Sequence, residues 1–524
     1  MSAQATSLRP QQVEPRSLGE LAAFLGAAPP AGSDAALPIS GVTLASNAVL
    51  PGDVFFALPG VKVHGAKYAA TAVTAGATAI VTDAAGATSL KQLGVPVLVI
   101  AEPRAQLGRT ASWVYRSADA NLEIFGVTGT NGKTSVVYLL AAVLDQLGVS
   151  AGLSSTAERR FPGHVEVSAL TTPEASDVHA LLARMAEAGV HSVAMEVSAH
   201  ATAHHRVDAV HFAAVGFTNF SQDHLDDFGS MEQYFAAKRA LFTPEYADRG
   251  VIVIDDDGGE QLAQQAPIPV VTISAKGAAA DWHVRVTQVT AMSTRFELTG
   301  PQDEQLSTTV PVVGDYMATN AALAIVMLVS AGHPFESIAA VLQRDGGINA
   351  YIPGRTEMVS GESGPAFYVD YGHTTEAFRS TLAALRTVTP GKLIMVFGAD
   401  GDRDSTKRQA MGCAAAEGAD VVIVTDFHPR SEDPAAIRAT LLEGARGAKS
   451  SADIREIASQ QEAVRAAIAM AGAGDTILYA GPGHENYREV NGEKIPYDAR
   501  ADVRSALSDA GFPPRAAAGQ GGSR

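Results

Sequence analysis

The feature that most constrains this chain is the segment from residue 121 to residue 148, which predicts a strand, a glycine-rich loop and a helix. Residues 124–127 form an apolar run typical of a buried strand, and residues 134–147 are apolar at helical spacing up to Gly148. The loop between them reads Gly129-Thr130-Asn131-Gly132-Lys133-Thr134-Ser135. Backbone N–H groups of such a loop, at a helix N-terminus, can surround phosphate oxygens. The segment therefore predicts an α/β domain with a phosphate site.

The end of this loop carries the two side chains that nucleotide chemistry needs. Lys133 can reach the β- and γ-phosphates of a nucleotide such as ATP, and the Thr134 hydroxyl can bind Mg²⁺. The spacing is not the common one, because Val127 stands where a glycine is expected. A glycine-rich turn that binds nothing is the alternative, and the Gly-Lys-Thr ending in this context disfavours it.

The composition restricts the class of protein and its partners. The chain has 524 residues, enough for three or four domains at about 150 residues each. Its net charge of −17 argues against nucleic acid or an anionic membrane as the main partner. Cys413 is its only cysteine, which fits a reducing cytosol. With no apolar signal core and no run of about 18 apolar residues, we expect a cytoplasmic protein without stable membrane insertion.

Short apolar runs and turns divide the chain into three α/β domains and a tail. We expect a small N-terminal domain over residues 1–105, a central domain with a mainly parallel sheet over 106–350, a second such sheet over 351–512, and a disordered tail over 513–524. Residues 282–298 alternate like strands and predict a small antiparallel addition. The predicted strands include residues 54–58, 79–82, 95–100, 191–197, 213–217, 366–370, 392–397, 421–425 and 476–480.

Polar residues follow two strands of the predicted central sheet. Glu196 ends one strand, where a carboxylate beside a phosphate loop could hold Mg²⁺, although an exposed strand-end glutamate is an equal alternative. Asp223 and His224 follow the next strand. A lone histidine is more often structural than a ligand, but its position beside Asp223, after a strand of the same domain, makes a functional role an equal alternative. Lys238, on a helix predicted over 231–242, by itself indicates only a solvated lysine.

The third domain offers two loops at strand ends. Residues 398–408 are dense in glycine and charge, and residues 481–485 follow another strand, so both are binding-site candidates. Arg430 could bind a carboxylate through two hydrogen bonds. The alternative is that the two loops are solvated and that Arg430 is an ordinary surface arginine.

Taken together, these motifs resemble the Mur ligase family, over about residues 40–505. They are most similar to the members that add the third residue of the peptidoglycan stem peptide. The motifs are Gly129 to Thr134, Leu170-Thr171-Thr172-Pro173, Met195-Glu196-Val197-Ser198, Phe217-Thr218-Asn219 with Asp223-His224-Leu225-Asp226, Pro353-Gly354-Arg355, and Gly401-Asp402-Arg403-Asp404 with Lys407-Arg408.

The resemblance implies an ADP-forming ligase that joins a free diamino acid to UDP-N-acetylmuramoyl-L-alanyl-D-glutamate through an acyl phosphate. It also implies a C-terminal Rossmann-like domain and a monomer. Lys133, Glu196, His224 and Lys238 would be catalytic, Lys238 would be carbamylated, and Thr134, Glu196 and His224 would hold Mg²⁺. ATP would bind the loop residues Gly129 to Ser135 with Asn320, Arg355 and Asp370. The muramoyl peptide would bind Leu44, Ser46, Thr171, Thr172, Ser198, His204 and Arg206. The amino acid would bind Arg403, Phe427, His428, Arg430, Gly481 and Glu485.

The sequence departs from the family pattern mostly in these substrate pockets. The family motif Asp-Asn-Pro-Arg, associated with meso-diaminopimelate, here has Phe427 and His428 in its first two positions. Lysine, ornithine and diaminobutyrate therefore rival diaminopimelate as the amino acid. Two other functions stay open at this point, a folylpolyglutamate synthetase-like ligase and a non-catalytic paralogue that binds nucleotide.

Overall fold

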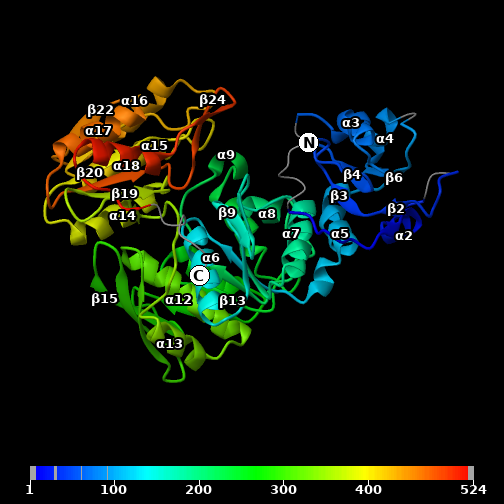
Figure 1. Ribbon diagram of the computed structural model, residues 1–524, viewed down its shortest axis with the longest axis horizontal. Coiled ribbons are helices and arrows are strands. Elements are labelled where there is room, and N and C mark those ends of the chain that lie inside the picture. The colour runs from blue at the N-terminus through cyan, green and yellow to red at the C-terminus, as the bar shows by residue number, and fades with distance from the viewer. Residues whose placement is uncertain (1–7, 29–31, 61, 91–92, 517–524) are drawn as a thin grey trace.

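The computed structural model describes residues 8–28, 32–60, 62–90 and 93–516. The chain forms three α/β bodies, each built on its own sheet. In Figure 1 the N-terminal body is blue, the central body is cyan to green, and the C-terminal body is yellow to red. The central body lies between the other two, so that its strand ends and connecting loops can meet residues from both neighbours.

The N-terminal body is a four-stranded parallel sheet in the order β3-β4-β5-β6. Its strands are β3 (Gly41–Thr43), β4 (Asp53–Ala57), β5 (Ala79–Thr82) and β6 (Val97–Val99). Its other elements are β1 (Arg16–Ser17), α2 (Leu18–Phe24), β2 (Pro38–Ile39), η1 (Gly65–Tyr68), α3 (Ala69–Thr74), α4 (Ala84–Ser89) and α5 (Pro103–Tyr115). Ser17 caps α2 by accepting from the N–H of Glu20, whose carboxylate returns to the Ser17 backbone, so a local signal starts the first helix.

Helix α5 connects the first two bodies. Leu107, Ala111 and Val114 pack in the N-terminal core together with Ala180 of α7 (Ala175–Glu187) in the central body. The boundary predicted after residue 105 therefore falls within a helix whose apolar face is shared between the two bodies.

The central body is an eleven-stranded sheet in the order β10-β9-β8-β11-β7-β12-β13-β14-β15-β16-β17. Its strands are β7 (Glu123–Thr128), β8 (Ala151–Ser154), β9 (Glu158–Phe161), β10 (His164–Val167), β11 (Ser192–Glu196), β12 (Ala214–Phe217), β13 (Gly250–Val253), β14 (Val270–Ser274), β15 (Trp282–Val289), β16 (Thr294–Thr299) and β17 (Gln305–Val310). The strands from β8 to β15 are parallel. The predicted antiparallel addition is present as β15–β17, and it continues the same sheet.

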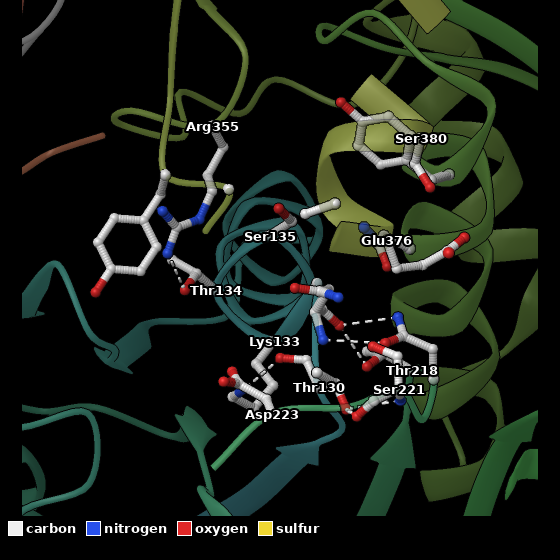
Figure 2. Close-up of a pocket in the computed structure, with 18 of the residues that line it drawn as sticks. Thr130, Lys133, Thr134, Ser135, Thr218, Ser221, Asp223, Arg355, Glu376 and Ser380 are labelled. Atoms are coloured by element: carbon white, nitrogen blue, oxygen red, sulfur yellow. Dashed lines mark hydrogen bonds between the residues drawn. The ribbon is translucent and has the colours of Figure 1, made fainter. Parts of the chain in front are cut away.

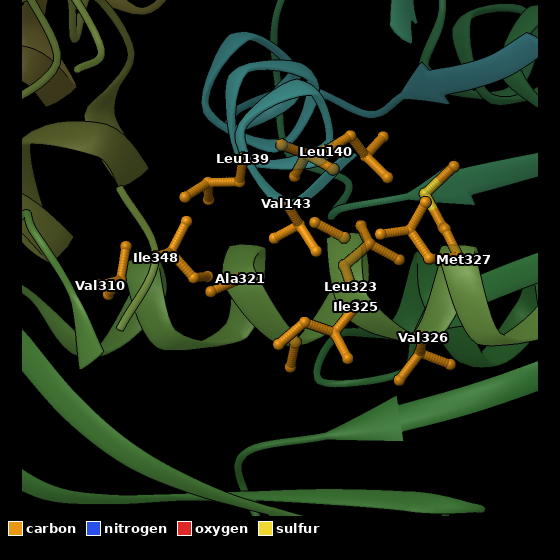
Figure 3. Packing of buried hydrophobic residues seen from close by; sticks show 14 of the residues in the cluster. Leu139, Leu140, Val143, Val310, Ala321, Leu323, Ile325, Val326, Met327 and Ile348 are labelled. Atoms are coloured by element: carbon orange, nitrogen blue, oxygen red, sulfur yellow. The ribbon is translucent and has the colours of Figure 1, made fainter. Parts of the chain in front are cut away.

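Helices cover both faces of the central sheet, and the pleat of β7 divides its side chains between them. Phe125 and Val127 join one core with α6 (Lys133–Gln146) and α12 (Asp315–Ala331), whereas Ile124 joins the core that contains α7. Figure 3 shows α6 crossing α12 through interlocked aliphatic side chains. The remaining central elements are η2 (Ser117–Ala120), α8 (Ala199–Ala203), α9 (Leu225–Phe228), α10 (Met231–Arg239), α11 (Asp257–Gln265) and α13 (Phe335–Arg344).

The C-terminal body is a six-stranded sheet in the order β18-β19-β23-β20-β21-β22, parallel except for β18. Its strands are β18 (Glu357–Met358), β19 (Ala366–Asp370), β20 (Leu393–Phe397), β21 (Val421–Val424), β22 (Asp453–Glu456) and β23 (Thr476–Ala480). Its other elements are α14 (Thr375–Val388), α15 (Arg408–Gly418), α16 (Pro434–Gly447), α17 (Gln460–Met470), the hairpin of β24 (Tyr487–Val490) and β25 (Glu493–Pro496), and α18 (Ala499–Asp509).

The start of the predicted tail is ordered. Pro514 forms an antiparallel bridge with Ser360, and the Arg515 N–H donates to the Val359 carbonyl at 2.9 Å. The prediction of disorder is therefore wrong for residues 513–516, because these backbone groups find partners at the edge of the C-terminal sheet. Residues 517–524 lie outside the described part of the chain. Within the described part, none of the helices has the length and apolar character needed to cross a bilayer.

Candidate functional site

The predicted phosphate loop connects β7 to α6, and its glycines are required by its geometry. Gly129 has φ +141° and Gly132 has φ +90°. A Cβ atom on Gly129 would lie 1.9 Å from Thr218 Oγ1, and one on Gly132 would lie 2.7 Å from Asn320 Oδ1. The loop therefore packs directly on neighbouring backbone and side chains, with the N-terminus of α6 at its end.

Two lysines converge on one carbonyl oxygen of this loop. Lys133 Nζ donates to Gly129 O at 3.0 Å and to Thr130 O at 2.8 Å, and Lys238 Nζ donates to Gly129 O at 2.6 Å. Lys238 is only 2% exposed and lies over the ring of Tyr234. Burial, and then the Lys133 charge, hold the pKa of Lys238 well below its ordinary value. The reading of Lys238 as a solvated helix lysine is therefore wrong, since its helix, α10, packs against the loop.

The first turn of α6 meets an arginine from the segment that leads into the C-terminal body. Arg355 Nη2 donates to Thr134 Oγ1 at 2.7 Å, as Figure 2 shows, and its guanidinium lies 4.2 Å from the ring centre of Tyr371. Burial lowers the pKa of Lys133, with Arg355 adding to this effect. Basic side chains thus gather at the loop of a chain that is strongly negative overall, and the nearby carboxylates of Glu196 and Asp223 oppose the fall in the pKa of Lys133.

Glu196 ends β11, next to the loop strand, and its carboxylate is 1% exposed. Its two oxygens accept from the Thr156 N–H at 2.7 Å and from Thr156 Oγ1 at 3.0 Å. Among the described residues, no Lys, Arg or His forms an ion pair with Glu196. A buried carboxylate whose hydrogen-bond partners are neutral is a suitable ligand for a divalent cation.

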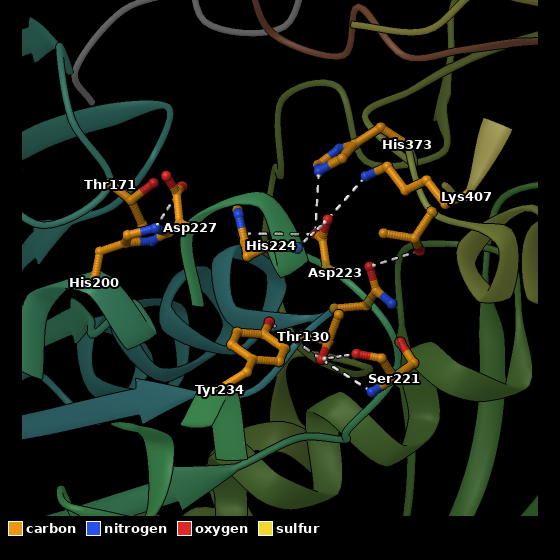
Figure 4. A network of polar contacts seen from close by, with 12 residues as sticks. Thr130, Thr171, His200, Ser221, Asp223, His224, Asp227, Tyr234, His373 and Lys407 are labelled. Carbon is orange, nitrogen blue, oxygen red and sulfur yellow. Dashed lines mark hydrogen bonds and ion pairs between the residues drawn. The ribbon is translucent and has the colours of Figure 1, made fainter. Parts of the chain in front are cut away.

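The segment after β12 carries two adjacent ionisable residues, and Asp223 Oδ2 lies 3.6 Å from His224 Nε2. His224 has φ +56°, a left-handed conformation that is strained for a non-glycine residue and is typical of functional sites. Burial lowers the pKa of His224 to about 3. Asp223 forms ion pairs with Lys407 at 2.8 Å and with His373 at 3.8 Å, both in the C-terminal body, as Figure 4 shows. Burial alone would raise the pKa of Asp223, but the Lys407 charge holds it below its ordinary value.

A single cavity of about 1030 Å³ lies where the strands of the central sheet end, and it is enclosed by residues from both large bodies. In Figure 2, Glu376 and Ser380 of α14 lie across it from the phosphate loop. Most of the predicted site residues line it, namely Thr130, Asn131, Gly132, Lys133, Thr134, Ser135, Thr171, Glu196, Ser198, His204, Arg206, His224, Asn320, Arg355, Asp370 and Arg403.

Several of these lining residues have defined partners. Ser198 caps α8 by accepting from the Ala201 N–H, and Arg206 pairs with Glu174 at 2.9 Å. Asp370 Oδ1 accepts from the Thr356 N–H at 2.7 Å, which fixes the end of β19. Thr172 is fully buried and does not line the cavity, because its hydroxyl donates to Glu196 O at 2.8 Å and supports the turn that follows β11.

Most of the predicted amino-acid residues form a separate cluster at the strand ends of the C-terminal sheet. His428 Nε2 lies 2.7 Å from Glu485 Oε2, and His428 Nδ1 accepts from the Glu489 N–H at 2.7 Å. Since Nδ1 accepts a hydrogen bond, Nε2 carries the proton that is donated to Glu485. Arg430 pairs with Asp400 at 3.1 Å and with Glu489 at 3.2 Å. Phe427 and Gly481 belong to the same cluster, where a Cβ on Gly481 would lie 3.8 Å from the Phe427 ring.

The two predicted uridine residues lie apart from this cavity. Leu44 and Ser46 follow β3 in the N-terminal body, and neither lines the cavity. Both are partly buried, in the turn after the strand.

Sequence reasoning missed several residues that complete the site. Thr156 holds Glu196 from an irregular turn after β8, and Tyr371 supports Arg355. His200 and Asp227 line the cavity beside His224. His200 stands two residues after Ser198, the last residue of a recognised motif, and this proximity was an available signal. The position of Thr156 depends on long-range strand pairing, and the sequence offered no signal for it.

Comparison with known proteins assigns this arrangement to one family. Three family models match the chain, described as the Mur ligase family catalytic domain over residues 38–115, the Mur ligase middle domain over 127–328, and the Mur ligase glutamate ligase domain over 354–483. The match to the middle domain begins in β7 and includes the whole phosphate loop.

Similar proteins extend over nearly the whole chain. The UDP-N-acetylmuramyl-tripeptide synthetase of Leifsonia xyli subsp. xyli is 55% identical over 97% of this chain and 99% of its own length. The UDP-N-acetylmuramoyl-L-alanyl-D-glutamate--2,6-diaminopimelate ligase of Streptomyces coelicolor is 42% identical over 95% of this chain and 98% of its own. A solved structure of a ligase with this latter name has a TM-score of 0.64 at 28% identity, covering 95% of this chain and 100% of that one. The chain therefore belongs to the Mur ligase family.

Proposed function

We propose that this chain is an ADP-forming ligase that uses ATP to add the third amino acid to UDP-N-acetylmuramoyl-L-alanyl-D-glutamate in peptidoglycan synthesis. The observation that carries the proposal is the single cavity, which joins a phosphate loop, the residues after β11 and a face of the C-terminal body. Such a cavity can bring a nucleotide, an acid and an amine together. The names of the relatives from Leifsonia and Streptomyces support the same reaction.

The nucleotide would lie on the phosphate loop. The glycines allow close approach of the backbone N–H groups, Lys133 and Arg355 supply positive charge, and Asn320 and Asp370 line the same side of the cavity. Phosphate oxygens would replace the loop carbonyls that now accept from Lys133. Catalysis then requires mainly positioning and charge neutralisation.

Thr134, Glu196 and His224 would hold Mg²⁺. The Thr134 hydroxyl and the buried Glu196 carboxylate offer the oxygen ligands that this ion prefers. When bound, the ion would neutralise charge on the transferring phosphoryl group.

We propose that Lys238 is carbamylated, with its neutral amine attacking CO₂ and releasing one proton. The buried position and lowered pKa of Lys238 support this step, since only the unprotonated amine is a nucleophile. With ¹³C-labelled bicarbonate, we expect a carbamate signal in the ¹³C NMR spectrum of the wild-type protein. The signal should be absent from Lys238→Ala and retained in Lys276→Ala, an exposed lysine near the same cavity. A wild-type spectrum without the signal would contradict the modification.

The acid substrate would bind between Thr171, Ser198, His204 and Arg206, with Thr172 supporting them and Leu44 and Ser46 contacting its uridine. A carboxylate oxygen of the dipeptide attacks the γ-phosphorus of ATP, and ADP leaves. The amine then attacks the resulting acyl phosphate and loses a proton, and phosphate leaves as the amide forms. Arg206 lies on this side of the cavity in an ion pair with Glu174, and its guanidinium could also donate hydrogen bonds to the anionic acid.

We propose a free diamino acid as the third substrate, bound through Arg403 and the cluster of Phe427, His428, Arg430, Gly481 and Glu485. One named relative specifies 2,6-diaminopimelate and the other specifies no amino acid. Lysine, ornithine and diaminobutyrate remain candidates beside diaminopimelate. We also propose that the enzyme acts as a cytoplasmic monomer, where ATP is available.

The test is phosphate release with ATP, Mg²⁺ and the UDP-muramoyl dipeptide, with candidate amino acids supplied one at a time. We expect release with one diamino acid. Glu196→Gln should lower kcat about a hundredfold or more by weakening the cation site. The matched control Glu260→Gln, an exposed residue of α11, should not change it. ATP binding without release for any amino acid would indicate a non-catalytic nucleotide binder.

A further inference from the structure

Two side chains on the cavity wall, His200 and Asp227, have no role in the proposed reaction, and they lie beside the proposed Mg²⁺ ligand His224. His200 comes from α8, His224 from the turn before α9, and Asp227 from α9 itself. One potential ligand atom of each lies within 4.8 Å of the other two. His200 Nε2 is 2.9 Å from Asp227 Oδ2, and the two imidazole rings meet edge to face with centres 4.9 Å apart. Figure 4 shows His200 and Asp227 together, with His224 beside them.

The backbone holds these side chains in place before any ion binds. The N–H groups of Asp227 and Phe228 donate to the His224 carbonyl at 3.2 Å and 3.0 Å, which fixes Asp227 one turn after His224. Helix α8 is anchored to α10 by the Thr202 hydroxyl, which donates to Ala237 O at 2.6 Å. The ligand atoms therefore need only small rotations of side chains to converge on one point.

The chemistry of this cluster differs from that of the proposed Mg²⁺ ligands. Two imidazoles and a carboxylate form a nitrogen-rich set, which suits zinc and its neighbours in the first transition row, whereas the proposed Mg²⁺ set has two oxygen ligands and one imidazole, and Mg²⁺ prefers oxygen. Asp223 lies 3.6 Å from His224 Nε2, on hand to orient that ring, as carboxylates beside metal-binding histidines commonly do. Three protein ligands at a cavity wall leave further coordination positions open to solvent or substrate.

We propose that His200, His224 and Asp227 form a binding site for one divalent transition-metal ion of the zinc class, distinct from the oxygen-rich Mg²⁺ site. Because His224 belongs to both sets and its Nε2 faces Asp223, its other nitrogen can serve only one of the two ions at a time. This inference does not depend on the identity of the substrates.

The test is a titration of the full chain with Co²⁺, followed by visible absorption, with no nucleotide or substrate present. We expect one Co²⁺ per chain with the intense visible bands of a low-coordinate site, displacement by one equivalent of Zn²⁺, and no displacement by millimolar Mg²⁺. Asp227→Asn and His200→Gln should each weaken binding about tenfold or more. The control His211→Gln changes an exposed histidine that pairs with Asp248 elsewhere on the surface, and should bind as the wild type does.

The design separates loss of the site from loss of the fold. Asp227 is exposed, so that Asp227→Asn should melt at the wild-type temperature. If His200→Gln is unstable, the Co²⁺ affinity of Asp227→Asn alone tests the site. A wild-type protein that leaves Co²⁺ with the spectrum of the aqueous ion would overturn the proposal. So would Asp227→Asn binding as tightly as the wild type, or ready displacement by Mg²⁺.

Discussion

A buried histidine can make the stability of a protein depend on pH, and His179 is such a residue. His179 of α7 is fully buried, with Nδ1 2.7 Å from Ser117 Oγ and Nε2 2.9 Å from Asp208 O. Burial lowers its pKa to about 4. Both ring nitrogens have partners, one in η2 and one at Asp208, so the neutral imidazole is part of the packing between α7 and these two segments.

We expect His179 to make the free energy of unfolding depend on pH between 6.5 and 4. The unfolded chain takes up a proton on this residue below about pH 6.5, whereas the folded chain does so only near pH 4, so stability falls as the pH falls. The loss should approach about 1.4 kcal/mol per pH unit in this window. Urea unfolding of wild type and His179→Gln should show the slope reduced in the variant, and the exposed control His211→Gln should keep it. Equal slopes in wild type and His179→Gln would contradict the assignment.

A second prediction at the level of single residues concerns Gly129 of the phosphate loop. Gly129→Ala introduces a Cβ where φ is +141° and where Thr218 Oγ1 lies 1.9 Å away, so the loop must move. We expect the variant to lose ATP binding in calorimetry and about 1–3 kcal/mol of stability.

The matched control is Gly447→Ala, at the end of α16, where nothing lies within 4 Å of the added atom. Its stability should lie within about 0.5 kcal/mol of the wild type, with ATP binding retained. Normal ATP binding by Gly129→Ala would show that the loop tolerates a side chain at this position.

At the scale of elements, the phosphate loop depends on how α6 packs against α12. Helix α12 is buried along most of its length, and a Cβ on Gly216 of β12 would lie 2.5 Å from Met327 Sδ, so the helix lies very close to the sheet. Asn320 of the same helix borders Gly132 in the loop. A shift of α12 would therefore be transmitted to the nucleotide site.

We expect Leu323→Ala, in the middle of α12, to destabilise the protein by about 2–5 kcal/mol, because the side chain is fully buried and leaves a cavity. Thermal unfolding measures the loss. The control Val165→Ala, at a position 64% exposed on β10, should cost less than about 0.5 kcal/mol. A loss of stability well below this range for Leu323→Ala would mean that α6 and α12 move together and fill the cavity.

Elements with strong local patterns were predictable from the sequence, and those set by long-range pairing were not. The runs at 124–127, 213–217 and 393–397 are continuous and apolar because parallel strands are covered on both faces. Strands β9 and β10 are short and polar, and they form only by pairing with each other and with β8. Similarly, the phosphate loop was evident in the sequence, whereas the burial of Lys238 depends on how α10 meets that loop.

At the scale of the whole molecule, a few polar contacts hold the C-terminal body against the central one. Lys407 pairs with Asp223, Gln222 Nε2 donates to Thr406 Oγ1 at 3.0 Å, and Thr374 Oγ1 donates to Asn131 Oδ1 at 3.3 Å. These contacts surround the cavity on the side of the phosphate loop, so the relative position of the two bodies determines the shape of the site.

We expect Lys407→Met to weaken this closed arrangement. Both partners of the Lys407–Asp223 pair are largely buried, and removing one leaves a carboxylate without its cation, at a cost of about 3–5 kcal/mol. The C-terminal body should then swing away, with a larger radius of gyration in small-angle scattering and a raised KM for ATP. The control Lys392→Ala, exposed at the start of β20, should change neither quantity. An unchanged radius of gyration for Lys407→Met would show that other contacts suffice.

Asp223 and His224 are consecutive residues. One peptide bond therefore joins the carboxylate that pairs with Lys407 of the C-terminal body to the imidazole on the cavity wall. The strained left-handed backbone at His224 leaves little freedom to absorb a movement of its neighbour. Separation of the C-terminal body from the central body and binding of a metal ion at the proposed site would therefore be linked equilibria, and each would shift the other by the same free energy. A bound ion would stabilise the closed arrangement by the same free energy by which the closed arrangement strengthens ion binding. The metal concentration of the medium would then affect the shape of the enzyme.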